Sequence, residues 1–337
     1  MQNLFCDKIM SNNIDVVIIT ALDKERNAVQ RYLDKFQQIE SNIFNLPHND
    51  TNSSYRVALL CVGKMGSVEA GIATTTAIAD FNPSIVILVG IMGGVKGDDR
   101  NLGDLIVADQ IVGYEQAKTT DTDTERRYEV LRPDNKLLKA TKNFSFTMSP
   151  IVPCPDGQNT IPNIHWGLVA SGEKVIADSK TIPELQKSWS KVIGVEMESY
   201  GVALAIYNAE SRPRFLMVKS ICDWANSEKN DNWQEYSADV AAEYVVSFLR
   251  SNHIQHNVEN DIIPKSSLDL YNRIRKLPRP LFNDICFYLQ EKYEYDLSFI
   301  NVNNAPSDSA HQLIEFLKQY PQGVNHLQQL LEERGLL

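Results

Sequence analysis

Several short, continuously apolar runs separated by helical patterns constrain the fold of this chain most. Runs rich in valine and isoleucine, with no polar alternation, are typical of strands buried on both faces of a sheet. The stretches between them have helical spacing or many small residues, which predicts crossover helices with right-handed connections. We therefore expect an α/β fold with a mixed central sheet flanked by helices. The runs are 14–20, 55–62, 85–90, 105–112, 165–170 and 214–221.

Two carboxylates stand at the end of a further apolar run, 192–195, just before a helix of small residues. Glu196 and Glu198 therefore lie near a strand-to-helix junction, where open α/β sheets bind their ligands. If residues 195–198 are extended, both side chains point to one side and can accept hydrogen bonds from a sugar diol. The alternative is that one or both only cap the helix N-terminus. The small residues suit close packing of this helix against the sheet.

Composition and charge limit which binding partners and which cellular compartment we expect for this chain. The 337 residues carry a net charge of −10 with no strong basic block, which argues against nucleic acid or an anionic membrane as the partner. The five cysteines are scattered and form no CxxC pair, so we expect no disulfide framework, no zinc site and a cytoplasmic location. We see no signal peptide, and the longest apolar run, 85–92, is too short to span a membrane. Neither a metal nor a cofactor is expected.

Changes in composition divide the chain. We expect an N-terminal tail over 1–13, a catalytic domain over 14–252, a polar linker over 253–265 and a small all-α domain over 266–337. The last has apolar residues at helical spacing, separated by prolines, and holds no His, Cys or Asp cluster, so no chemistry is assigned to it. Within the catalytic domain we interpret the polar stretch 114–134 as one long functional loop.

Six short motifs occur in a specific order along the first domain, and the ordered set is more informative than any single motif. Together they resemble the purine nucleoside phosphorylase and uridine phosphorylase superfamily, and most of all its methylthioadenosine/S-adenosylhomocysteine nucleosidase branch, over about residues 14–251. The resemblance implies the nucleoside phosphorylase-like fold and a purine nucleosidase. The motifs are Ile19-Thr20-Ala21-Leu22 with Glu25, Val89-Gly90 with Gly93-Gly94, residues 102–108, Ala170-Ser171-Gly172, residues 195–198 and Ser220-Ile221-Cys222-Asp223.

The resemblance also implies roles for single residues. Glu25 would orient and deprotonate the attacking water, and Asp223 would deliver a proton to purine N7. Glu198 would bind the ribose hydroxyls. The further substrate-binding residues expected are Met197 beside the sugar, Val175 and Ile176 at the base, Gly93 and Gly94 as a turn beneath the ribose, and Glu196, Ile91 and Lys174 around them.

Cleavage of an N-glycosidic bond explains why these residue types are needed. The sugar passes through an oxocarbenium-like state, and the purine leaves better when N7 is protonated. Asp223 must then keep a proton near neutral pH, which burial beside Trp224 would favour, while Glu25 must accept one. The structural alternatives are a helix N-cap for Asp223 and a solvated first-turn residue for Glu25.

Three functional readings stay open, and water is the nucleophile we expect. A carboxylate such as Glu25 would repel phosphate at short range, and Ile91 and Met92 offer no donor side chain. Arg26 adjoins Glu25, but we expect it to point off the helix into solvent. The alternatives are a phosphate-dependent nucleoside phosphorylase and a nucleoside-sensing module.

The chain departs from the methylthioadenosine enzymes in two places. Lys174 stands where a small residue is usual, and the 114–134 stretch is rich in basic side chains. Cationic groups suit a 5′-phosphate better than a thioether, so Lys118, Arg126 and Arg127 suggest an adenine nucleotide such as ATP or AMP as substrate. The alternative is that these charges only solvate a long loop.

The C-terminal helices resemble an effector-associated domain, a small death-like adaptor of bacterial antiviral proteins. The matching stretches are 282–289, 311–317 and 327–331. The resemblance implies a protein partner with a like domain, and a nucleotide-depleting effector in bacterial antiviral defence. The superfamily of the first domain implies a homo-oligomer, at least a dimer, in which a neighbour's loop completes the 5′ end of each site.

Overall fold

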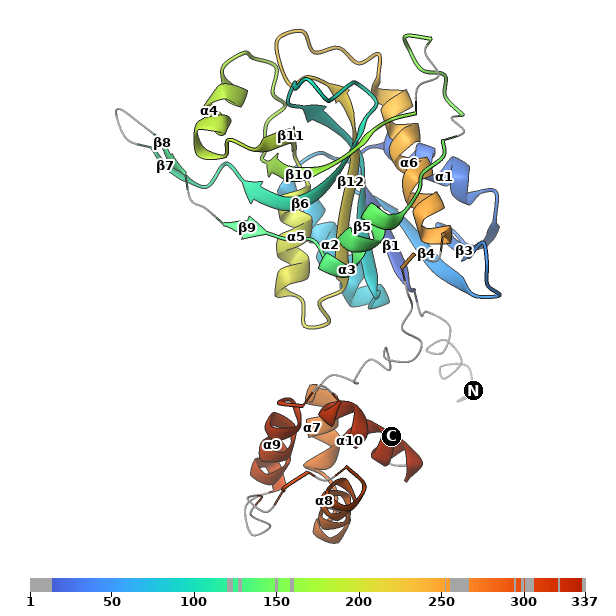
Figure 1. Cartoon of the computed structure of the whole chain (residues 1–337), viewed down its shortest axis with the longest axis vertical. Coiled ribbons are helices and arrows are strands. Elements are labelled where there is room, and N and C mark those ends of the chain that lie inside the picture. The colour runs from blue at the N-terminus through green and yellow to red at the C-terminus, as the bar shows by residue number, and fades with distance from the viewer. Residues whose placement is uncertain are drawn as a thin grey trace, which may run out of the picture. The chain divides into compact units, whose positions relative to one another are not determined.

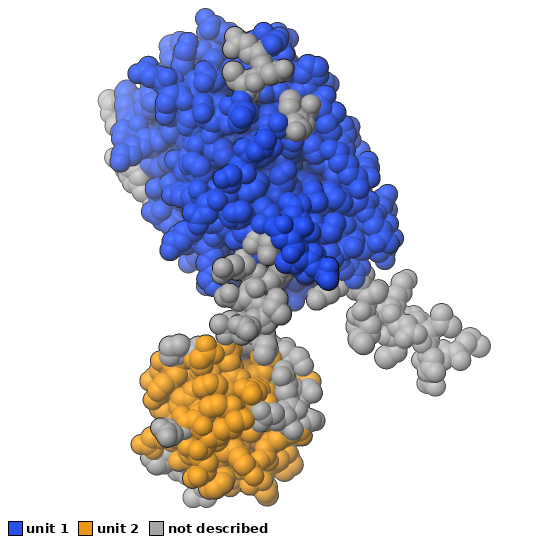
Figure 2. All heavy atoms as spheres, turned by 45° about the vertical axis from the view of Figure 1, so that its right-hand side comes forward, with its two compact units in different colours: residues 1–254 blue, residues 255–337 orange. Residues whose placement is uncertain are grey.

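The computed structural model describes residues 14–119, 124–126, 129–148, 151–157, 161–251, 253–254, 267–293, 295–297, 300, 306–320 and 322–334. The chain divides into two compact units, residues 1–254 and 255–337 (Figure 2). The expected tail over 1–13 and most of the expected linker lie outside the described residues.

A mixed sheet forms the centre of the larger unit (Figure 1). Its strands follow the order β11-β10-β6-β12-β5-β1-β4-β3-β2, and β9 pairs with β6. β11 also pairs antiparallel with the end of β5, so the sheet closes back on itself there. The strands are β1 (Val16–Thr20), β2 (Gln37–Glu40), β3 (Ile43–Pro47), β4 (Ser54–Cys61), β5 (Ile85–Gly94), β6 (Leu105–Gly113), β9 (Val130–Leu131), β10 (Ile164–Ser171), β11 (Val192–Glu196) and β12 (Arg214–Asp223).

Helices cover both faces of this sheet, as the continuously apolar runs predict. Along β1, Val16 and Ile18 belong to the core beneath α1 and α6, whereas Val17 and Ile19 belong to the core beneath α2 and α5 (Figure 1). The expected α/β class is therefore confirmed. The helices are α1 (Asp23–Leu33), α2 (Ser67–Phe81), α3 (Asn135–Asn143), α4 (Thr181–Ser188), α5 (Ser199–Asn208) and α6 (Gln234–Arg250).

The small residues of α5 allow close packing against another helix. α5 packs against α2, and a Cβ added at Gly201 would collide with the carbonyl oxygen of Ser67. We expected these residues to bring the helix close to the sheet. They also allow the close approach of α2, which begins at Ser67 and carries the loop before it to the edge of the sheet.

Two local expectations are corrected, and one hairpin was not expected at all. The glycines 93–94 form no turn, because β5 continues through Gly94 and pairs there with β11. The stretch 114–134 is no single loop, since it contains a hairpin of β7 (Ala117–Thr119) and β8 (Thr124–Arg126) as well as β9. The hairpin β2–β3 was missed because Gln37–Glu40 is polar and exposed, without an apolar face to reveal it.

Over its described residues the smaller unit forms helices and no strands, as expected. Its helices are α7 (Ser267–Ile274), α8 (Arg279–Tyr293), α9 (Pro306–Leu317) and α10 (Gly323–Glu333). They share one core in which Leu270, Ile285, Leu313 and Leu327 are completely buried. Of the helices that the structure describes in either unit, none is long and apolar enough to cross a membrane.

Candidate active site

A cavity of roughly 110 Å³ lies where the carboxyl ends of β1, β5, β11 and β12 meet. Parallel neighbours end at the same edge of a sheet, so side chains at these ends converge. Glu25, Glu198 and Asp223 all line it, from α1, the start of α5 and the end of β12. The other lining residues from the sequence-based expectation are Ile91, Gly93, Lys174, Val175, Ile176, Glu196 and Met197.

Glu25 is held with its carboxylate in the cavity and is 2% exposed. One oxygen accepts the N–H groups of Ala21 and Leu22, at 2.8 and 2.9 Å, and the other accepts that of Ile91 at 2.8 Å. A Cβ on Gly90 would collide with this carboxylate, so a glycine is needed there. Burial raises the pKa of Glu25 above its usual value, against the opposing charge of Lys219. A buried carboxylate with a raised pKa is a stronger base toward water.

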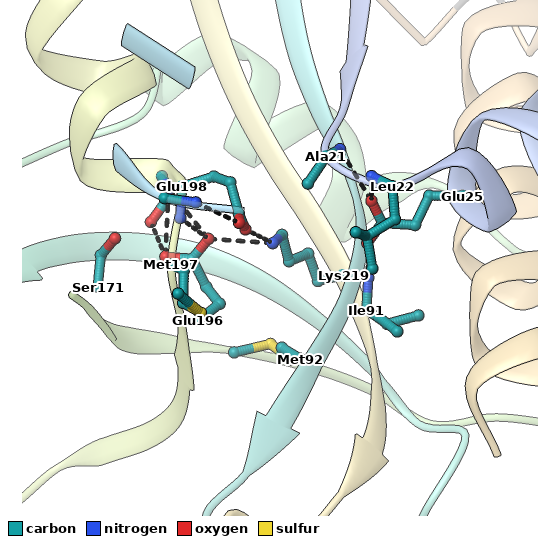
Figure 3. A network of polar contacts seen from close by, with 12 residues as sticks. Ala21, Leu22, Glu25, Ile91, Met92, Ser171, Glu196, Met197, Glu198 and Lys219 are labelled. Atoms are coloured by element: carbon teal, nitrogen blue, oxygen red, sulfur yellow. Dashed lines mark hydrogen bonds and ion pairs between the residues drawn. The ribbon is translucent and has the colours of Figure 1, made fainter. Parts of the chain in front are cut away.

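Lys219 joins the two glutamates at the end of β11 (Figure 3). Its ammonium lies 2.6 Å from Oε2 of Glu198 and 3.1 Å from Oε2 of Glu196, and the residue is only 1% exposed. Burial lowers the pKa of Lys219, but the charges of Glu198 and Glu196 outweigh it and raise the pKa above its usual value. Lys219 is therefore charged at neutral pH.

Glu196 caps the helix, which was one of the two alternatives. Its carboxylate accepts the N–H of Glu198 and the N–H and hydroxyl of Ser199. Burial raises the pKa of Glu196, but Lys219 and these hydrogen bonds outweigh it and lower the pKa below its usual value. With its oxygens occupied, Glu196 is a poor partner for a sugar diol, although it lines the cavity.

Glu198 faces the cavity, and fewer protein groups bind its carboxylate than bind that of Glu196. Besides Lys219, it accepts the N–H of Gly66 at 3.2 Å, from a residue whose φ of 124° favours glycine. Residue 198 is the helix N-cap, with αR backbone angles, so the condition that residues 195–198 are all extended is not met. The two glutamates converge because both bind one ammonium, and strand alternation is not the cause.

Asp223 ends β12 opposite Gly93 in the register of the sheet. It is 5% exposed; Oδ1 accepts the N–H of Ala225 at 2.8 Å, and Oδ2 forms an ion pair with Lys229. A Cβ on Gly93 would lie 3.1 Å from Oδ1 and 2.8 Å from the Ala225 side chain, so glycine leaves room beside the acid. From the sequence we expected burial beside Trp224 to control the protonation of Asp223. The ion pair with Lys229 was not predicted.

The loop after β10 supplies another part of the cavity wall. Ile176 is buried, while Val175 is half exposed. The Lys174 side chain, 67% exposed, pairs with Glu115 at 2.9 Å. Lys174 therefore stands at the rim of the cavity, where it can meet a group that projects from a bound ligand.

Several expected site residues lie elsewhere. Gly94 does not line the cavity, since its neighbours are Ile221 and Trp224. Lys118 and Arg126 belong to the β7–β8 hairpin, which projects from the sheet in Figure 1, and neither lines the cavity. Arg127 lies outside the described residues. Arg26 runs along α1, bonded to Gln30 and Asn27, as expected.

The family model of the Phosphorylase superfamily matches residues 15–250, which is more than half of the chain. The chain belongs to this superfamily. A "Death domain-containing ATP nucleosidase" from Amphimedon queenslandica is 27% identical over 210 residues, covering 58% of this chain and 39% of that protein. A "5'-methylthioadenosine/S-adenosylhomocysteine nucleosidase" from Exiguobacterium is 27% identical over 230 residues, covering 66% and 90%.

A solved structure supports the fold of this superfamily member independently. The methylthioadenosine/S-adenosylhomocysteine nucleosidase of Neisseria meningitidis superposes with a TM-score of 0.53 at 19% identity, over 70% of this chain and 99% of that one. The expected family resemblance is thus confirmed, and both of these relatives are named as nucleosidases, in agreement with the expected enzyme class. The chain spans about half or less of the length of two curated relatives that it matches.

Proposed function

We propose that this chain is a purine nucleosidase, which uses water to hydrolyse the bond between adenine and ribose in a nucleoside or nucleotide. The observation that supports this most is the convergence of three carboxylates, Glu25, Glu198 and Asp223, on one cavity. Each carboxylate has different hydrogen-bond and ion-pair partners, as three different roles in the reaction would need. Two carboxylates with opposed roles are a recurrent way to divide acid and base work in glycoside hydrolysis.

In this proposal the ribose lies against Glu198 and Met197, which line the same wall. Glu25 takes the proton of the water that attacks C1′, and its raised pKa suits that task. Asp223 faces the leaving purine at N7. Ionised carboxylates around the sugar also favour the positive charge that develops on it in the transition state.

The substrate that we propose is an adenine nucleoside or nucleotide. Support comes from the relatives, one named an ATP nucleosidase and another a methylthioadenosine/S-adenosylhomocysteine nucleosidase. Among the described basic residues, Lys174 at the rim is the one that we assign to a 5′-phosphate, since Lys118 and Arg126 do not line the cavity and Lys229 pairs with Asp223. In a homo-oligomer, a neighbour's hairpin could bring such residues to the site.

The cellular role that we propose is depletion of an adenine nucleotide as an effector in bacterial antiviral defence. The C-terminal helices would be the adaptor that binds a protein partner. The relative whose name combines a death domain with ATP nucleosidase activity supports this pairing of an enzyme with an adaptor. A phosphorylase is the weaker alternative, because among the described residues that line the cavity none is arginine and Glu25 occupies the nucleophile side.

The test is product analysis with ATP, AMP, adenosine and methylthioadenosine, with and without phosphate. We expect free adenine and a reducing sugar in the absence of phosphate. Glu25→Gln and Asp223→Asn should each lower kcat by roughly 10²–10⁴-fold, whereas Lys136→Met, an exposed change on α3, should not. A requirement for phosphate would establish a phosphorylase, and ligand binding without turnover would establish a sensor. Cleavage of methylthioadenosine alone would remove the nucleotide hypothesis.

A further inference from the structure

The proposed acid of the cavity is ion-paired in the free protein. Lys229 donates from Nζ to Oδ2 of Asp223, while Oδ1 accepts the N–H of Ala225. The Asp223 side chain is 5% exposed and that of Lys229 is 24% exposed. Both oxygens of the carboxylate therefore already accept hydrogen bonds, and the lysine alone reaches solvent.

Lys229 is presented by a well-defined turn. Ala225 has a left-handed φ of 49°, and the N–H of Lys229 donates to the carbonyl of Asn226 at 3.2 Å. The end of the turn is fastened by Gln234, which donates to Asp231 and accepts from Lys24 of α1. This turn thus spans from the acid at the end of β12 to the helix that carries Glu25.

Both oxygens of Asp223 act as hydrogen-bond acceptors here, yet a general acid must give a proton. The Asp223–Lys229 pair as a whole still holds a transferable proton, on Nζ. Building on the proposed function, we propose that Lys229 is a positioning residue that supplies, through Asp223, the proton taken up by the leaving purine.

The proton and electron balance of this step is complete. The C1′–N9 bond breaks and its electron pair stays with the purine. N7 takes a proton from Asp223, which takes one from Nζ of Lys229 and leaves a neutral amine. Water adds to C1′ and gives its proton to Glu25. Lys229 then recovers a proton from solvent through its exposed side, and Glu25 releases one.

The groups that face Lys229 keep it charged at neutral pH. Burial lowers the pKa of Lys229, but the hydrogen bond and charge of Asp223 outweigh it, with help from Asp231, and raise the pKa above its usual value. Cys222 lies 3.6 Å from Oδ2, and burial together with Asp223 raises the pKa of its thiol, which stays neutral. Glu25, from α1, adds negative charge near Cys222. Lys229 therefore keeps its proton until the purine becomes basic.

Two variants distinguish whether Lys229 supplies the proton or only holds Asp223 in place. We would measure kcat for the full chain, Lys229→Met and Lys229→Arg on adenosine and ATP, at about pH 6 and about pH 9. Without Lys229, Asp223 acts only while it is itself protonated, so the methionine variant should lose much more activity at the higher pH, up to roughly 10²–10⁴-fold. Arginine keeps the charge but does not release a proton, so its loss should be similar at both pH values. Lys136→Met is the matched control.

The outcomes are distinct. If arginine restores kcat to the wild-type value, or if the methionine variant loses the same factor at both pH values, Lys229 only supports the acid and the inference is wrong. Thermal unfolding and adenine binding report whether each variant is folded, and the arginine variant carries the test should the methionine variant not fold. A wild-type chain that cleaves none of the nucleosides refutes the proposed function itself.

Discussion

Replacing Lys219 by methionine tests whether one buried ammonium holds the sugar end of the site together. The change leaves two carboxylates, each less than a tenth exposed, without the cation that lies 2.6 and 3.1 Å from them. Removing one partner of a buried ion pair costs about 3–5 kcal/mol, because the remaining charge is uncompensated. For a unit of this size, that lowers the melting temperature by roughly 6–20 °C.

The pH dependence of this loss identifies its cause. In the wild type the lowered pKa of Glu196 contributes stability above its unfolded pKa, and that contribution disappears as the pH falls through the folded value. In the variant, the charge of Lys219 no longer opposes the burial of Glu196, which should raise the pKa of that carboxylate, so stability falls as the pH rises through the raised value. The difference in melting temperature between variant and wild type should therefore be larger at about pH 8 than at about pH 5.

The assay is thermal unfolding of the full chain at both pH values, following the transition of the larger unit. The double variant with Glu198→Gln should recover part of the loss at about pH 8, since one orphaned charge is removed. Lys136→Met should stay within about 0.5 kcal/mol of the wild type. A loss independent of pH, or no recovery in the double variant, would show that Lys219 acts through packing and refute the electrostatic argument.

Other changes probe the remaining contacts. Because the pKa of Glu25 is raised and the base must be ionised, the acid limb of the kcat/KM profile should lie above the usual pKa of glutamate, 4.5; a limb at or below that value would contradict its assignment. Gly93→Ala places a methyl group 3.1 Å from Asp223 and should lower kcat with a stability cost of about 1–3 kcal/mol, as enzyme kinetics and urea unfolding would show. Gly201→Ala should lower the melting temperature through the α2–α5 contact, and an unchanged value would mean that the helices separate freely. Lys174→Met should raise KM for ATP more than for adenosine, and equal effects would remove its role at a phosphate.

The sequence was sufficient for the fold and for the residues at the ends of strands. Continuously apolar runs predicted the buried strands, and the ordered motifs placed Glu25, Glu198 and Asp223, which the structure brings to one cavity. The roles of these residues came from the resemblance of the motifs, and the structure brings them together because topology decides where strand ends lie.

The two lysines were missed for different physical reasons. Lys219 lies inside the apolar run 214–221, and a lysine within a buried strand is itself a signal, since a buried charge requires partners. Lys229 lies in a polar stretch without periodicity, and it meets Asp223 only because Ala225 turns the chain into a left-handed conformation. No local pattern in the sequence requires that turn.

The charges around the cavity also bear on where a nucleotide substrate would place its phosphates. Four carboxylates, Glu25, Glu196, Glu198 and Asp223, face two buried or half-buried ammonium groups, those of Lys219 and Lys229. An excess of negative charge stabilises a cationic sugar, but it repels a phosphate brought to the same place. A nucleotide would therefore keep its 5′-phosphates outside the carboxylates, on the side of Lys174. The carboxylates inside the cavity would therefore carry out the bond cleavage. Lys174 at the rim would determine whether a nucleoside or a nucleotide is preferred.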